Sequence, residues 1–164
     1  MAAYNEEKVI EAKIRSVFAN NYPQELIEFL IGSDNSSDNT NQILLTLKEE
    51  FPQLKITLFT SRQGKINIFN QLVPLAKHEL IISTDANNIF HNNTIIELVS
   101  AISSGDNIGL VDSYIMHTDL KEDGMSHQEN TYISQEAKTK FNEGILFGVT
   151  AGPFGGCYIF RKKL

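Results

Sequence analysis

Three groups of polar residues follow short apolar runs of this 164-residue chain, and their side chains have the chemistry of a phosphate-binding site. The groups are Ser33–Asp38, Arg62 with Gly64 and Lys65, and Asp85-Ala86-Asn87. Asp85 and Asn87 offer oxygen ligands to a hard cation such as Mg²⁺ or Mn²⁺. Arg62 and Lys65 can meet a diphosphate, and Asp34 can accept hydrogen bonds from a base or a ribose. Together these residue types favour a site for a nucleotide-sugar.

The elements that must bring these groups together are short strands that alternate with amphipathic helices. Strands are predicted at Ile27–Ile31, Lys55–Phe59, Leu80–Thr84, Ile108–Val111 and Cys157–Phe160. Helices are predicted at Glu6–Asn20, from Asp38 or Asn39 to Phe51, from Ile66 to Val73, from Ile95 to Ile102, and at Gln128–Asn142. This alternation predicts an α/β fold with a mostly parallel sheet flanked by helices. Ligands bind beyond the carboxyl ends of the strands in such sheets, so the three groups should share one rim.

Each group by itself also has an ordinary structural explanation. Ser, Asp and Asn are common in turns and at helix starts, and Asp38 is expected to cap the second helix. Asn5 is expected to cap the first helix in the same way. Tyr4 could pack on that first helix, and Lys65 could simply be a solvated residue at a helix start. The combination of all three groups, rather than any one of them, favours a ligand site.

The composition argues against several other classes of protein. The formal net charge is −6, from 14 Lys and Arg against 20 Asp and Glu, which argues against a nucleic-acid partner. Cys157 is the only cysteine and cannot form an internal disulfide, which favours a reducing, cytoplasmic location. No apolar run reaches the ~20 residues that span a bilayer. Neither G-x-x-x-x-G-K-[ST] nor G-x-G-x-x-G occurs, so the kinase, GTPase and dinucleotide-oxidoreductase classes lose their main support.

Five short motifs, in order along the chain, give it a resemblance to a known family. They are Ala3-Tyr4-Asn5-Glu6-Glu7, Ser33–Thr40, Gly64-Lys65 with Asn70, Asp85-Ala86-Asn87, and Gly155-Gly156 with Phe160-Arg161-Lys162. Over nearly its whole length the chain resembles the inverting family 2 glycosyltransferases of the GT-A fold. The resemblance implies transfer of a sugar from a nucleotide-diphosphate sugar to a saccharide or lipid-linked acceptor, as in polysaccharide or cell-envelope biosynthesis. It also implies Mg²⁺ or Mn²⁺ as the cofactor.

The resemblance implies a role for each matching residue. The residues implied on the donor side are Tyr4, Glu6, Asp34, Arg62, Lys65 and Asp85. Among them Asp34 would bind the base, while Asp85 would serve both the ribose and the metal. Asn87 stands where the family usually has the second Asp of its D-x-D motif, so a neutral amide would be the second metal ligand. Gly155 and Gly156 would line the acceptor side.

Two departures from the family pattern concern the ends of the chain. Only Met1 and Ala2 stand where the family has an apolar strand, and losing an interior strand would leave unpaired backbone groups and an open groove. The general base of the family lies on an acidic motif after the F-R-K segment, so it is expected beyond Leu164. We therefore expect residues 1–164 to form a single domain, truncated at both ends, with little or no activity alone. Any membrane association is expected through other parts of the parent protein, at the inner face of the membrane.

Two other functions stay open on the sequence. The chain could bind a nucleotide-sugar without turning it over, or it could be a nucleotidyltransferase-like domain. Nucleotidyltransferases usually show a Gly-rich, basic segment near the N-terminus, and this sequence has none there. Consumption of a labelled nucleotide-sugar separates an enzyme from a protein that only binds the donor.

Overall fold

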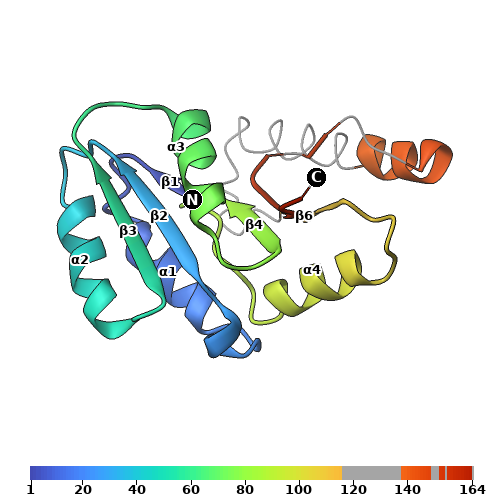
Figure 1. Ribbon diagram of the computed structural model, residues 1–164, viewed down its shortest axis with the longest axis horizontal. Coiled ribbons are helices and arrows are strands. Elements are labelled where there is room, and N and C mark those ends of the chain that lie inside the picture. Colours follow the sequence, from blue (N-terminus) through green and yellow to red (C-terminus); the bar gives the residue numbers. More distant parts are fainter. Residues whose placement is uncertain (116–137, 149–151, 154, 164) are drawn as a thin grey trace, which may run out of the picture.

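The computed structural model describes residues 1–115, 138–148, 152–153 and 155–163 (Figure 1). Its strands are β1 (Ala2–Ala3), β2 (Phe29–Asp34), β3 (Leu54–Phe59), β4 (Leu80–Thr84), β5 (Leu110–Asp112) and β6 (Cys157–Arg161). Its α-helices are α1 (Ile10–Phe18), α2 (Thr40–Glu50), α3 (Lys65–Leu72) and α4 (Thr94–Ser103), with a further helix over residues 138–147. Short 3₁₀ turns lie at Gln24–Leu26 and Val73–Leu75. The loop expected at Thr118–His127 and most of the helix expected at Gln128–Asn142 lie outside the described residues.

The strands form two three-stranded sheets, which confirms the expected α/β architecture with parallel strands flanked by helices. β1, β2 and β3 are parallel, with Ala3 opposite Ser33 and Asp34 opposite Phe59. The second sheet differs from the expected pattern, because β6 lies between β4 and β5 and runs antiparallel to both. The late apolar run at Cys157 thus becomes a central strand, buried at Ile159. Alternation along the sequence cannot reveal such an insertion, because it orders only neighbouring elements.

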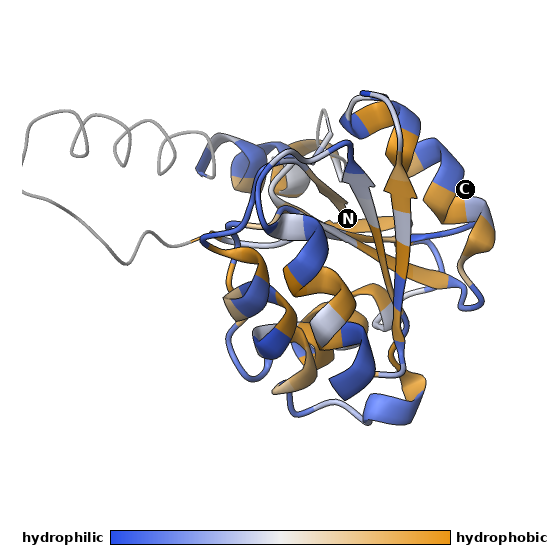
Figure 2. Cartoon of the chain, turned by 90° about the vertical axis from the view of Figure 1, so that its left-hand side faces the viewer, coloured by the Kyte–Doolittle hydropathy of each residue, from blue (hydrophilic) through white to orange (hydrophobic). Residues whose placement is uncertain are grey.

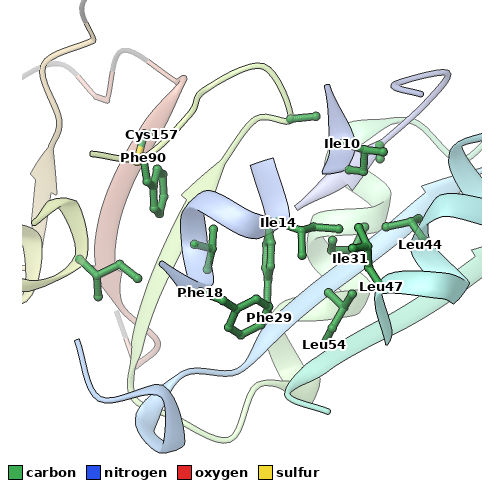
Figure 3. Close-up of a cluster of buried hydrophobic side chains, with 14 of the residues drawn as sticks. Ile10, Ile14, Phe18, Phe29, Ile31, Leu44, Leu47, Leu54, Phe90 and Cys157 are labelled. Carbon is green, nitrogen blue, oxygen red and sulfur yellow. The ribbon is translucent and has the colours of Figure 1, made fainter. Parts of the chain in front are cut away.

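Helices cover both faces of the first sheet, so that alternate residues of β2 face different layers. Phe29 and Ile31 pack with α1 and α2, as Figure 3 shows for the side chains of Ile10, Ile14 and Phe18. The ring of Phe18 stacks on that of Phe51, just past α2, at 4.5 Å between centroids. Figure 2 shows the same division, since strands are largely orange while helices carry both orange and blue positions. Burying one apolar stripe per helix is the main stabilising contribution to such a layered fold.

Two expected boundaries are wrong for local reasons. The first helix begins at Ile10 rather than Glu6, and Asn5 does not cap it. Asn5 has φ of 54° and its side-chain oxygen instead accepts a hydrogen bond from the Ser37 backbone N–H at 2.8 Å. The strand expected to end at Ile31 continues through Asp34, because both neighbouring strands pair with its last residues. Asp34 is therefore held at a strand end and is not part of a free loop.

The first strand is short and is extended by hydrogen bonds between Met1 and β2. The Met1 amino group donates to the Leu30 carbonyl at 2.9 Å, and the Met1 carbonyl accepts from Gly32 N–H at 2.9 Å.

A cavity of about 330 Å³ lies between β2 and β4, with Phe29 and Ile82 among its lining residues. Within the described residues, no helix is both long and apolar enough to cross a membrane.

The approach of α3 to β2 requires glycine at position 32. A Cβ added to Gly32 would lie 2.4 Å from Ile68 Cγ2 and 3.0 Å from Phe59 Cε2, and Ile68 is fully buried. We expect Gly32→Ala to destabilise the fold by about 1–3 kcal/mol through overpacking, as urea unfolding would measure. Adding Ile68→Ala removes the clashing methyl, so the double variant should lose less stability than the sum of the single changes. Additive losses would show that the close approach is not the cause.

Candidate functional site

The expected donor-side residues lie at the ends of β1, β2 and β3 in the parallel sheet and of β4 in the second sheet, and direct contacts join several of them. Tyr4 and Glu6 follow β1, Asp34 ends β2, and Asp85 follows β4. Gly64 and Lys65 bridge two of these strands, because Gly64 N–H donates to Asp34 at 3.0 Å and Lys65 Nζ lies 2.5 Å from Asp85. Two neighbouring residues at the start of α3 therefore connect the end of β2 with the turn after β4.

Asp34 is a buried carboxylate, 3% exposed, and it accepts hydrogen bonds from the loop before α3. Its oxygens accept hydrogen bonds from the backbone N–H groups of Gln63, at 2.6 Å, and Gly64, and from Arg62 Nε at 3.2 Å. Burial alone would raise the pKa of Asp34, but these hydrogen bonds and the Arg62 charge outweigh it and hold the pKa below its usual range. The carboxylate is thus charged and occupied by the protein's own donors. A base that binds here has to share or replace one of them.

Tyr4 and Arg62 form a stacked pair next to Asp34. The Arg62 guanidinium carbon lies 3.3 Å from the centroid of the Tyr4 ring, and Tyr4 is 41% exposed. An arginine over an aromatic face is attracted by the ring quadrupole, here at a partly solvated surface. The pair presents a flat, cationic surface directly beside the Asp34 carboxylate.

Asp85 lies within an acidic environment that one lysine partly neutralises. Glu6 and Asp38 carry further carboxylates in this part of the site. Burial, followed by the charges of Asp85 and Asp38, raises the pKa of Glu6. The Lys65–Asp85 pair has side chains that are 57% and 38% exposed, so it contributes little stability and can open at small cost. Asn87 is exposed two residues further on. The position therefore combines a solvent-accessible carboxylate with neighbouring negative charge.

This donor set fits a divalent cation that a ligand helps to coordinate. Among the described residues, no three His, Cys, Asp or Glu side chains gather as a ready-made metal cage. Mg²⁺ is commonly bound by only one or two carboxylates together with substrate phosphates and water. Asp85, with the Asn87 amide oxygen nearby in sequence, supplies that smaller protein share. The acidic surroundings of Glu6 are a further reason for a cation to be stabilised at this rim.

The N-cap residue of α2 is Asn39 rather than the expected Asp38, although the Asp38 carboxylate still binds the first residue of that helix. One carboxylate oxygen accepts from Thr40 N–H at 3.0 Å, at the first residue of α2, and the other accepts from Glu7 N–H at 3.1 Å. Burial acts to raise the pKa of Asp38, but the hydrogen bonds lower it by more than burial raises it. The pKa of Asp38 therefore lies below its usual value. Asp38 therefore fixes the loop after β1 against the start of α2.

The Gly155-Gly156 segment lies against the Asp85 turn. The Gly156 carbonyl accepts from Asp85 N–H at 3.1 Å and from Asn88 Nδ2 at 2.6 Å. A Cβ at Gly156 would lie 2.3 Å from Ile115 Cδ1, so the position has no room for a side chain. Gly155 has φ of 98°, a conformation that favours glycine. The two predicted sides of the site thus share a hydrogen-bonded boundary.

Sequence reasoning missed two residues beneath this boundary, Lys13 and Asn88. Lys13 is fully buried, and its Nζ donates to Thr84 Oγ1 at 2.8 Å and to the Asn88 carbonyl at 2.5 Å. Burial lowers the pKa of Lys13 to about 7. The signal was present in the sequence, because Lys13 stands in the apolar stripe of α1 beside Ile14. A lysine in a buried stripe needs buried partners.

The layered arrangement of sheets and helices defines a GT-A-like α/β domain. The family model described as Glycosyl transferase family 2 matches residues 1–164, and the chain belongs to this family.

Two curated relatives show how much of a longer protein this chain resembles. It is 35% identical over 101 residues to beta-monoglucosyldiacylglycerol synthase of Trichormus variabilis, a match covering 60% of this chain and 22% of that protein. It is 27% identical over 111 residues to poly-beta-1,6-N-acetyl-D-glucosamine synthase of Staphylococcus epidermidis, covering 68% of this chain and 26% of that protein. The chain spans about a quarter of the length of these relatives.

Solved structures share the fold at low sequence identity. A mannosyltransferase from Pyrobaculum calidifontis, in complex with GDP-Man and Mn²⁺, is 22% identical with a TM-score of 0.73, covering 99% of this chain and 43% of that one. Glucosyl-3-phosphoglycerate synthase from Mycobacterium tuberculosis, in complex with UDP, is 16% identical with a TM-score of 0.60, covering 99% of this chain and 55% of that one. These likenesses support the fold assignment.

Proposed function

We propose that this chain forms the donor-binding part of an inverting glycosyltransferase, which transfers a sugar from a nucleoside-diphosphate sugar to an acceptor. The observation that carries the proposal is the contact network at the rim. Arg62 touches both Tyr4 and Asp34, while the adjacent Gly64 and Lys65 contact Asp34 and Asp85. Family membership supports the same reaction class.

The nucleotide is proposed to bind over the Tyr4–Arg62 pair and beside Asp34. A planar base can stack on an aromatic or guanidinium face, while the carboxylate accepts a hydrogen bond from a base N–H. Glu6 lies on the same side of the rim, after β1, and is proposed to contact the nucleotide too. Lys65 is proposed to release Asp85 and to meet the diphosphate as a point charge.

Asp85 and Asn87 would hold the divalent cation at this site. When bound, such a cation stabilises the negative charge that develops on a departing diphosphate. The protein's own share is to orient Asp85 through its N–H bond to Gly156 and to supply Lys65 as a nearby positive charge. Asp85 is in place before the ligand arrives, while Lys65 has only to open a partly exposed ion pair, which costs little. A neutral Asn87 gives the cation less charge than a second carboxylate would.

The acceptor is proposed to approach from the Gly155-Gly156 side. Gly155 faces open space, which leaves room for a ligand group, and both glycines present backbone rather than side chains. Relatives named as synthases of a glycolipid and of a polysaccharide support a lipid-linked or saccharide acceptor in the cell envelope. A cytoplasmic site of action, at the inner face of the membrane for a lipid-linked acceptor, is part of the same proposal.

Calorimetric titration tests the donor site directly. UDP and GDP are titrated into the chain with Mn²⁺ and then with a chelator in place of the metal. We expect at least one nucleotide to bind more tightly with Mn²⁺. The proposal would be overturned if neither nucleotide bound, with Mn²⁺ or with chelator. Where binding is found, incubation with labelled nucleotide-sugar and acceptor separates turnover from binding alone.

A further inference from the structure

Lys13 places an amine in the core directly beneath the metal-binding turn. Its side chain is fully buried, and the Nζ also lies 3.5 Å from the centroid of the Phe90 ring. A buried amine is costly unless it is well paired, so its surroundings have to supply hydrogen-bond acceptors. Those acceptors are Thr84 Oγ1 and the Asn88 carbonyl. They stand immediately before and immediately after Asp85-Ala86-Asn87.

Lys13 therefore joins the two ends of the turn that carries Asp85 and Asn87. The turn's own closing hydrogen bond, from Asn88 N–H to the Asp85 carbonyl, is long at 3.4 Å. A bond of that length is weak, so it restrains the turn little. The two bonds from Lys13, to Thr84 Oγ1 and to the Asn88 carbonyl, add a restraint on both ends of the turn from the core side.

Asn88 extends this restraint to the opposite side of the site. Its main-chain carbonyl accepts from Lys13, while its side-chain amide donates to the Gly156 carbonyl. The same Gly156 carbonyl accepts from Asp85 N–H. A continuous series of hydrogen bonds thus runs from the core amine, through Asn88, to the Gly155-Gly156 segment.

We infer that Lys13 and Asn88 are positioning residues that couple the Asp85–Asn87 turn to the Gly155-Gly156 segment. Neither is assigned a contact with substrate or cation. Lys13 fixes the turn from the core, and Asn88 fixes the glycine segment to the turn. The structural part of this inference stands on the free protein, whereas its effect on ligand binding rests on the proposed function.

Hydrogen–deuterium exchange of the free protein tests the coupling. The variants are Lys13→Met, which keeps the stem and removes the amine, and Asn88→Ala. Each should speed exchange of amides in the Asp85 turn and in residues 155–158 by about fivefold or more. Lys13→Met removes the bonds that hold the turn, and Asn88→Ala removes the side-chain bond between the turn and Gly156. Ile14→Val, one residue along α1 and equally buried, is the matched control and should change neither region selectively.

Nucleotide titration supplies the functional readout. With Mn²⁺ present, each variant should weaken UDP or GDP binding by about tenfold, because partners that orient metal ligands typically matter at this level. With chelator present the affinity should stay near that of the parent chain. The double variant should be little weaker than either single variant, since both act through one turn.

The possible outcomes separate the two proposals. Unchanged exchange in residues 155–158 of both variants would overturn the coupling, as would equal losses of affinity with Mn²⁺ and with chelator. A general rise in exchange, including β2 and β3, would also overturn it by showing simple destabilisation. If the parent chain binds no nucleotide, the proposed function fails, while the exchange measurement still decides whether the coupling exists.

Discussion

Replacing Asp85 with alanine is expected to remove the cation-dependent part of nucleotide binding. Asp85 is the only carboxylate of the Asp85–Asn87 pair, and its half-buried side chain follows directly after β4. Without it, the Asn87 amide and water would have to hold the cation against a neighbouring Lys65. We expect the affinity for UDP or GDP to fall by about 100-fold in the presence of Mn²⁺.

Isothermal titration of the parent chain and of Asp85→Ala, each with Mn²⁺ and with chelator, measures this effect. The two proteins should bind nucleotide similarly in chelator, where Asp85 has no cation to hold. Asp106→Ala is the matched control, because Asp106 is an exposed carboxylate in the turn before β5. Equal affinity in all four titrations of the first two proteins would exclude a role for Asp85.

Asn87→Asp is expected to strengthen cation binding, which is the opposite of the effect expected for Asp85→Ala. Asn87→Asp restores a second carboxylate, and an additional anionic oxygen strengthens the attraction for a divalent cation. We expect a lower Mn²⁺ concentration at half-maximal nucleotide binding, by about threefold to tenfold. A rise in that concentration would mean that Asn87 does not face the cation.

Replacing Asp34 with asparagine is expected to cost the fold about 3 kcal/mol. The carboxylate accepts three hydrogen bonds, and an amide would turn its own N–H₂ towards one of those donors. A buried donor left unpaired, together with the lost charge, accounts for a cost of this size. Urea unfolding of Asp34→Asn at pH 7 measures it, with the exposed Glu49→Gln on α2 as the control.

The stability difference between the parent chain and Asp34→Asn should depend on pH with a definite sign. Because the folded pKa of Asp34 lies below its usual value, the ionised carboxylate stabilises the folded state above the unfolded pKa. That contribution is lost as the pH falls through the folded pKa. The stability difference between the parent chain and Asp34→Asn should therefore be constant above about pH 5 and shrink below about pH 4. A difference that grows on acidification would contradict this assignment.

The two variants should also differ in how they affect nucleotide binding. Asp34 is proposed to contact the base, so Asp34→Asn should weaken binding by a similar factor with Mn²⁺ and with chelator. Asp85→Ala should act only when the cation is present. The pair of measurements therefore separates base contacts from phosphate and cation contacts within one site.

The sequence predicts that the polar groups after the strands lie together, because this prediction needs only a local pattern and one topological rule. Each polar group comes directly after an apolar strand, and parallel strands direct their carboxyl ends to one side. The structure confirms that β2 and β3 are parallel and places Asp34, Lys65 and Asp85 within one contact network. The binding roles proposed for these residues depend on the titrations described above.

The sequence did not reveal how the site residues are already engaged with one another. The sequence suggests Asp34 as a base-binding carboxylate without showing that it also accepts from the backbone of Gln63 and Gly64. Asn5 was interpreted as a helix cap, but it binds Ser37. Both residue types serve several purposes with the same polar atoms, and the nearest donor in space decides which purpose prevails.

By itself, the sequence determined the family, the alternation of strands and helices, and the polar residues that follow β2, β3 and β4. These features depend on spacing within short segments, where helical and strand periods can be read directly. Only the tertiary structure decided that β6 enters between β4 and β5 and that Lys13 lies beneath the Asp85 turn. The contacts from Lys13 to Asn88 and from Asn88 to Gly156 join residues 75 and 68 positions apart. No local pattern encodes such contacts, because they form only when packing brings buried polar groups together and each must find a partner.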